Sequence, residues 1–171
     1  MRKAKKNIYG MIAVLFALVM AFAMLTGCGK ADISAYADEE ITVTGLLDED
    51  FTITPRELSE MECVSDKAVG ETEKAGTVKA YGPTLDTFLA NYGVSKDDLY
   101  SIKFYAKDDY TSTLGKITWD QYEVIFSIAY GSEAFDEDTA PLRIVIPGGK
   151  SGNWIRMVTK MEFTYKALSN A

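Results

Sequence analysis

The chain has 171 residues, of which 47% are hydrophobic, and its net charge is −7. It contains no histidine, which excludes Ser-His-Asp and Cys-His catalytic systems, zinc sites built on paired histidines, and haem held by histidine. The acidic charge also argues against nucleic acid as a partner, because phosphate groups require a basic surface. Length and apolar content together indicate one domain with a substantial core.

The N-terminal residues have the pattern of a secretory signal peptide. Four basic residues precede an uncharged apolar run over residues 8–25, and the run ends in Leu25-Thr26-Gly27-Cys28. This tetrapeptide resembles the bacterial lipobox, in which a diacylglycerol is attached to the cysteine and the peptide before it is cleaved off. We therefore expect Cys28 to anchor the protein to the extracytoplasmic face of the cell membrane. An uncleaved anchor is the alternative, since an apolar run of 18 residues can span a bilayer.

Cleavage after residue 27 leaves 144 residues that carry 14 basic and 25 acidic side chains, a net charge of −11. Residues 28–40 have few apolar side chains, so we expect them to form a polar tether that does not pack. The domain is then predicted to span residues 41–166, with 167–171 as a short tail. Because anionic lipid headgroups repel so acidic a domain, the lipid itself would provide the attachment to the membrane.

Within the domain, many short strands and a few short helices predict an α+β fold built on a single mixed or antiparallel sheet. Thr54, Pro55 and Glu57 form a capping box for a short helix, and residues 84–92 form an amphipathic helix before Gly93. A further helical turn is predicted over residues 118–122. Strands are predicted over residues 41–47, 51–53, 63–69, 77–81, 102–106, 111–114, 123–130 and 141–147. We expect the last of these to pair with the strands at 123–130 and 102–106.

The strand over residues 141–147 runs into a glycine-rich, basic loop, residues 148–156. Its glycines allow backbone N–H groups to approach an anion, while Lys150 and Arg156 supply positive charge. The loop therefore predicts an anion-binding site. A wide hairpin with a solvated lysine is the alternative interpretation.

Three segments of the domain carry motifs that together are typical of one protein family. The first is Tyr81-Gly82-Pro83-Thr84-Leu85 ahead of a helix, and the second is the hairpin Asp108-Asp109-Tyr110-Thr111-Ser112-Thr113-Leu114. The third is the strand Ala140-Pro141-Leu142-Arg143-Ile144-Val145-Ile146-Pro147. Over about residues 41–165 the chain thereby resembles the sulfite-oxidase-type molybdopterin-binding domain. Asp109 stands where that family usually has glycine.

The resemblance implies a sulfite-oxidase-like fold, a molybdenum–molybdopterin cofactor, and redox chemistry on a small oxyanion with a redox partner. Cys63 would provide a thiolate to molybdenum, while Lys67, four positions later, and Tyr110 would face the substrate. The residues implied to bind the cofactor are Arg143, Lys150, Ser151, Asn153, Trp154 and Arg156. We then expect Cys63 and Lys67 at the mouth of one cleft with the loop at 150–156, where positive charge would lower the pKa of the thiol.

The chain also departs from the family. The cysteine segment is Cys63-Val64-Ser65-Asp66-Lys67 where the family has Cys-Ala-Gly-Asn-Arg, and the usual arginines and histidines around the pterin are missing. A lone domain cysteine is, moreover, usually a buried apolar residue. Two alternatives therefore stay open, a cofactor-free ligand-binding domain and a protein-interaction module of the cell envelope, and enzymatic activity is undecided.

The lipobox leads to a first prediction. Mass spectrometry of the native N-terminus should show a diacylglyceryl cysteine at position 28, and Cys28→Ala should block both lipid attachment and processing, so that the variant keeps its leader. A mature protein that begins at Met1, or a Cys28→Ala variant that is processed and fractionated like the parent, would contradict the assignment.

Overall fold

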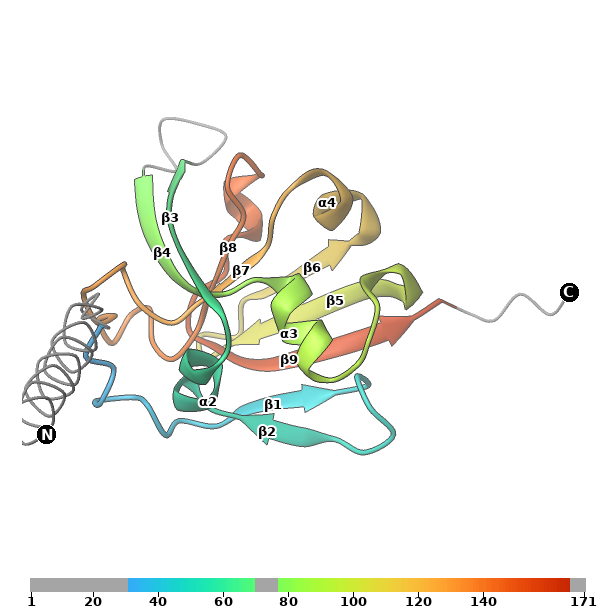
Figure 1. Cartoon of the computed structure of the whole chain (residues 1–171), viewed down its shortest axis with the longest axis horizontal. Helices are drawn as coiled ribbons and strands as arrows, with labels where there is room; N and C mark the ends of the chain where they lie inside the picture. Colours follow the sequence, from blue (N-terminus) through green and yellow to red (C-terminus); the bar gives the residue numbers. More distant parts are fainter. Residues whose placement is uncertain (1–30, 70–76, 167–171) are drawn as a thin grey trace, which may run out of the picture. The chain divides into compact units, whose positions relative to one another are not determined.

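The computed structural model describes residues 31–69 and 77–166; the signal peptide, Cys28 and the tail at 167–171 lie outside these residues. The main element is a five-stranded mixed sheet with the strand order β2-β1-β9-β5-β6 (Figure 1). Strands β1 and β9 are parallel, and the other neighbours are antiparallel. The strands are β1 (Ile41–Thr44), β2 (Phe51–Ile53), β5 (Leu99–Ala106), β6 (Thr111–Gly115) and β9 (Val158–Tyr165).

Two antiparallel pairs complete the strands of the described chain: β3 (Cys63–Val69) with β4 (Thr77–Pro83), and β7 (Ile125–Ser127) with β8 (Arg143–Val145). The two pairs are joined at Tyr81, whose N–H donates to Ala129 O over 3.2 Å and whose carbonyl accepts from Ile128 N over 2.7 Å. The helices are α2 (Pro55–Glu60), α3 (Leu85–Asn91), α4 (Lys116–Gln121) and the short 3₁₀ turns η2 (Lys96–Asp98) and η3 (Ser151–Asn153). These elements confirm the predicted α+β class. No helix in the described ranges is long and apolar enough to cross a membrane.

The helix ends follow the local sequence. Thr54 and Glu57 form the predicted capping box, with Thr54 N 2.7 Å from the Glu57 carboxylate and Glu57 N 3.3 Å from Thr54 Oγ1. Helix α3 is capped by Thr84, whose side chain accepts from Thr87 N over 3.1 Å, without the reciprocal bond of a capping box. Helix α4 begins at Lys116, two residues before the predicted turn and directly after β6 ends, and Gly115 is its N-cap residue.

Phe88 of α3 lies at the centre of the core and is fully buried. Its ring centroid is 5.1 Å from that of Phe126 in β7 and 6.0 Å from that of Phe163 in β9. Phe126 also contacts Phe104 of β5 edge-to-face at 6.1 Å. These aromatic contacts, each favourable beyond the area that it buries, connect the strand pair β7–β8 to the five-stranded sheet.

The predicted pairing of residues 141–147 is half right. Strand β8 pairs with β7 in the expected region, with Ile125 opposite Val145 and Phe126 opposite Ile144. The expected pairing with residues 102–106 is wrong, because β9 and β6 occupy the two edges of β5. Strands β5 and β8 share a core without sharing hydrogen bonds.

The polar stretch at 28–40 was expected to remain unpacked, and for its described part this is wrong. Tyr36 and Ala37 are buried, with exposed fractions of 4% and 2%. The Tyr36 hydroxyl donates to Ile128 O over 2.8 Å and accepts from Phe135 N over 2.9 Å. The segment is held further by a backbone bond from Arg56 N to Ala37 O over 3.0 Å. Ion pairs of Asp38 with Arg56 and of Glu39 with Lys107 add to it.

Gly82 is the tightest backbone contact between β4 and β7. A Cβ atom at this position would lie 2.0 Å from Phe126 O, whereas a Cβ at Gly152 would have no heavy atom within 4 Å.

We therefore predict that Gly82→Ala lowers the free energy of unfolding by about 1–3 kcal/mol, because the β7 backbone must shift. The matched control Gly152→Ala should lower it by less than about 0.5 kcal/mol. Urea denaturation of both variants measures the difference, and equal effects at the two positions would show that the close packing of β4 on β7 is wrong.

Candidate functional site

The loop after β8, strand β8 itself and the turn between β5 and β6 together form a cavity of about 310 Å³. We call it the arginine cavity. Its lining consists of Asp108, Tyr110, Arg143, Ser151, Gly152, Trp154 and Arg156. Five of these, namely Tyr110, Arg143, Ser151, Trp154 and Arg156, are site residues predicted from the sequence.

The glycine-rich loop is fixed in place by side chains rather than by regular structure. Trp154 is 7% exposed, and its indole N–H donates to Ile146 O over 3.0 Å. The Tyr110 hydroxyl donates to Gly152 O over 2.9 Å, which connects the loop to the β5–β6 turn. Because these bonds hold η3 against the sheet, the cavity wall is formed before any ligand binds.

The two arginines lie on neighbouring segments. Ile144 N donates to Ile155 O over 2.8 Å, and Val158 N donates to Leu142 O over 3.0 Å. These bonds pair the backbone on both sides of Arg143 with the backbone on both sides of Arg156. The cavity thereby receives two guanidinium groups from positions 13 residues apart in the chain.

Arg143 has an unmet hydrogen-bonding group. Its Nε is buried and has no hydrogen-bond partner within the described structure. None of the ion pairs formed by the described residues includes Arg143 or Arg156. A buried donor without a partner costs about 1–3 kcal/mol, more when it is charged. Because Arg143 lines the cavity, this donor belongs to the guanidinium group that an anion in the cavity would meet.

The β5–β6 turn adds a carboxylate. Asp109 has a φ of 64°, the left-handed conformation, at the position where the sulfite-oxidase-type family usually has glycine. Next to it, Asp108 accepts a hydrogen bond from Tyr110 N over 3.2 Å and lines the cavity. Asp108 was not predicted as a site residue, although its place two positions before Tyr110 in a tight turn was a usable signal.

Four predicted site residues do not line the arginine cavity. Lys150 precedes η3 and is exposed, and Asn153 lies 3.5 Å from Ser112 through its side-chain oxygen. Lys67 is exposed in the middle of β3, opposite Lys79. Cys63 begins β3, is half-buried, and has its Sγ 3.5 Å from Leu58 O.

Strand β3 contacts the glycine-rich loop through its last residue, Val69, whereas Cys63 is its first residue. Gly148 N donates to Val69 O over 3.1 Å, and six residues of strand, about 20 Å, separate Val69 from Cys63. Lys67 is two residues from this contact. The roles predicted for Cys63 and Lys67 remain predictions, since neither side chain is part of the cavity that collects the other residues.

The sequence matches no family profile and no curated protein. The structure is similar to the crystal structure of the sulfane dehydrogenase SoxCD from Paracoccus pantotrophus, with a TM-score of 0.61 and 17% sequence identity. The match covers 78% of this chain and 40% of that chain, so the described domain corresponds to less than half of the neighbour. This likeness establishes a sulfite-oxidase-like α+β fold, as the sequence predicted.

The unmet donor of Arg143 leads to a prediction about stability. Arg143→Met, which keeps an unbranched side chain but removes the buried N–H, should raise the free energy of unfolding by about 1 kcal/mol in buffer without multivalent anions. The control Arg56→Met should give no gain, because the Arg56 guanidinium is exposed and pairs with Asp38 at 2.8 Å. A loss of stability in Arg143→Met under these conditions would mean that Arg143 is satisfied within the protein.

Proposed function

We propose that this chain is a lipid-anchored protein of the extracytoplasmic membrane face whose sulfite-oxidase-like domain binds a small oxyanion in the arginine cavity. The anchoring half of the proposal rests on the lipobox at Leu25-Thr26-Gly27-Cys28 behind a basic, apolar leader. The binding half rests on the geometry of the cavity.

One observation supports oxyanion binding most strongly: Arg143 Nε is buried without a partner beside a second guanidinium that forms no ion pair. Guanidinium groups bind carboxylates and tetrahedral oxyanions through paired N–H bonds, and these bonds are stronger than neutral hydrogen bonds. The domain is otherwise acidic, so two adjacent arginines without carboxylate partners form a local positive site.

Each lining group has a chemical role in this proposal. Arg143 and Arg156 would neutralise the anion, and the Ser151 hydroxyl could donate a further hydrogen bond. The carboxylate of Asp108 is a hydrogen-bond acceptor, so it favours an anion that carries an O–H group, such as hydrogen phosphate or hydrogen sulfite. Trp154 adds an aromatic, largely buried side chain to the lining.

The lining does not fit the complete molybdenum cofactor. A volume of about 310 Å³ lies at the lower end of the usual range for small-molecule sites, ~300–1,000 Å³, which suits an oxyanion better than a pterin. The indole N–H of Trp154 already donates to Ile146 O, and the sulfur of Cys63 does not line the cavity. We therefore propose ligand binding and derive no redox step.

Calorimetric titration of the full chain in neutral detergent tests the proposal, with sulfate, phosphate and sulfite as probes at constant ionic strength. We expect one site per chain, and at least about tenfold weaker binding in Arg143→Gln and in Arg156→Gln. Arg56→Gln is the matched control and should bind like the parent. Constant ionic strength is needed because sulfate also stabilises folded proteins through a general salt effect.

Two outcomes would contradict the proposal. The first is equal binding by the parent and the Arg143→Gln variant, which would assign the signal to non-specific charge. The second is about one molybdenum per chain in protein made by a host that synthesises the cofactor, if that metal is lost in Cys63→Ala. The second result would establish a cofactor site in place of the oxyanion site.

A further inference from the structure

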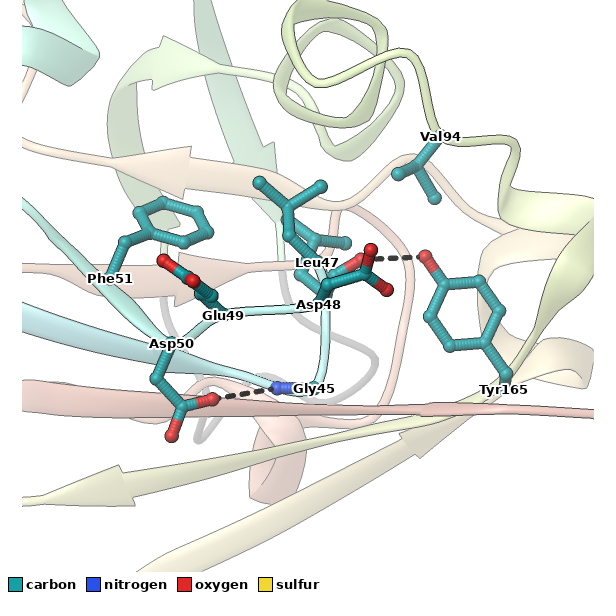
Figure 2. A pocket seen from close by; sticks show the side chains of 9 residues that line it. Gly45, Leu47, Asp48, Glu49, Asp50, Phe51, Val94 and Tyr165 are labelled. Carbon is teal, nitrogen blue, oxygen red and sulfur yellow. Dashed lines mark hydrogen bonds between the residues drawn. The ribbon is translucent and has the colours of Figure 1, made fainter.

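A second hollow lies at the other end of the sheet, between the β1–β2 connection and the end of β9. Its volume is about 760 Å³, within the range of ~300–1,000 Å³ typical of ligand sites. Leu47, Phe51, Val94 and Tyr165 line it together with the carboxylates that follow Leu47 (Figure 2). We call it the acidic groove.

The apolar part of the groove is accessible to solvent. Leu47 is 44% exposed and Tyr165 is 41% exposed, while Phe51 and Val94 are half-buried. Figure 2 shows Phe51 and Tyr165 at opposite sides of the groove, with Leu47 between them. A group of exposed apolar side chains that lines a hollow is typical of a surface that binds a partner.

The rim of the groove is negative and has no counter-charge. Asp48, Glu49 and Asp50 are exposed, and none of them forms an ion pair with a described lysine or arginine. Burial raises the pKa of the Tyr165 hydroxyl, and the negative charges of Asp98 and Asp48 raise it further. A cation placed on this rim would therefore be stabilised.

The groove is formed without a ligand. The Tyr165 hydroxyl donates to Leu46 O over 2.7 Å, and Asp50 accepts a longer bond of 3.4 Å from Gly45 N. Gly45 adopts a φ of +70°, and a Cβ atom there would lie 2.4 Å from Phe163 O, so the connection can lie against β9 only with glycine. A preformed groove lowers the entropic cost of binding.

We propose that the acidic groove binds a basic, apolar segment of a partner protein in the cell envelope. The segment would place an aliphatic or aromatic side chain against Leu47 and Tyr165, and lysine or arginine side chains beside Asp48 and Glu49. This inference is independent of the arginine cavity, which lies at the opposite end of β9.

Charge complementarity distinguishes this occupant from others. A second copy of the chain would bring like charges together in a symmetric interface, and an anionic lipid surface would be repelled. No group of three or more cysteine, aspartate or glutamate side chains in the described ranges is placed to hold a metal ion.

The test uses the full chain in neutral detergent and three fluorescein-labelled, amidated peptides: Lys-Leu-Lys-Leu-Lys, Lys-Gly-Lys-Gly-Lys and Glu-Leu-Glu-Leu-Glu. Fluorescence anisotropy should show binding of the first peptide, and at least about tenfold weaker binding of the other two. Leu47→Ser, and separately Asp48→Asn combined with Glu49→Gln, should each weaken binding of the first peptide by about tenfold. The matched control, Glu137→Gln combined with Asp138→Asn, removes the same charge from another exposed loop and should change binding by less than about twofold.

Three results would overturn the proposal. One is binding of Lys-Leu-Lys-Leu-Lys no tighter than that of the glycine peptide. Charge attraction alone would then explain binding, and the apolar side chains of the groove would contribute nothing to it. Another is equal weakening of peptide binding in the Asp48→Asn, Glu49→Gln variant and in the Glu137→Gln, Asp138→Asn control. This result would assign binding to the net charge of the protein. The third is a concentration-dependent dimer in sedimentation that Leu47→Ser abolishes, which would make a second copy the occupant. Thermal denaturation of each variant confirms that it is folded before binding is compared.

Discussion

Strand β9 and the residues directly before it hold this domain together. β9 pairs in parallel with β1 on one side and antiparallel with β5 on the other, so it connects the first strand of the domain to the middle of the sheet. Ahead of it, Ile155 O accepts from Ile144 N, and Met157 bonds through its backbone to Thr139 and to Lys107. Met157 has a φ of 55°, an uncommon conformation for methionine, and these two backbone bonds hold it there.

Both candidate sites depend on this segment. Arg156 lies two residues before β9 begins, and Tyr165 is its last residue. The arginine cavity therefore forms where the chain enters the central strand, and the acidic groove forms where the chain leaves it. The domain separates opposite charges in this way: two unpaired guanidinium groups at one end, and three carboxylates without counter-ions at the other. An unpaired buried donor such as Arg143 Nε carries a free-energy cost, and a hydrogen bond to an anion would remove that cost.

The sequence was most informative where structure is determined locally. The capping box at Thr54 and Glu57, the amphipathic face of α3 and the turn at Asp109 each depend on residues a few positions apart, and all three were predicted. The resemblance to the sulfite-oxidase-type family then predicted the fold, and it named five of the residues that line the arginine cavity, whose functional roles stay predictions. The fold prediction succeeded because the motifs combine local structure with a known chain path.

The remaining features depend on contacts between distant segments. Nothing near residues 141–147 indicates that β9 will occupy the edge of β5, so the pairing of β8 with β5 was predicted wrongly. Tyr36 is one aromatic residue in a polar stretch, and its burial depends on acceptors and donors about 90 to 100 residues away. The acidic groove was not predicted for the same reason, since Leu47, Val94 and Tyr165 meet only in the folded chain.

The central claim is that Arg143 presents a buried, unsatisfied N–H to a small anion. The most direct measurement is the NMR signal of the Arg143 side-chain Nε–H, followed during a phosphate titration at constant ionic strength. The account predicts a signal that exchanges slowly with water and that shifts saturably, while the Nε–H of exposed Arg56 shows no saturable change. An Arg143 signal that stays constant, or that moves linearly together with that of Arg56, would contradict it.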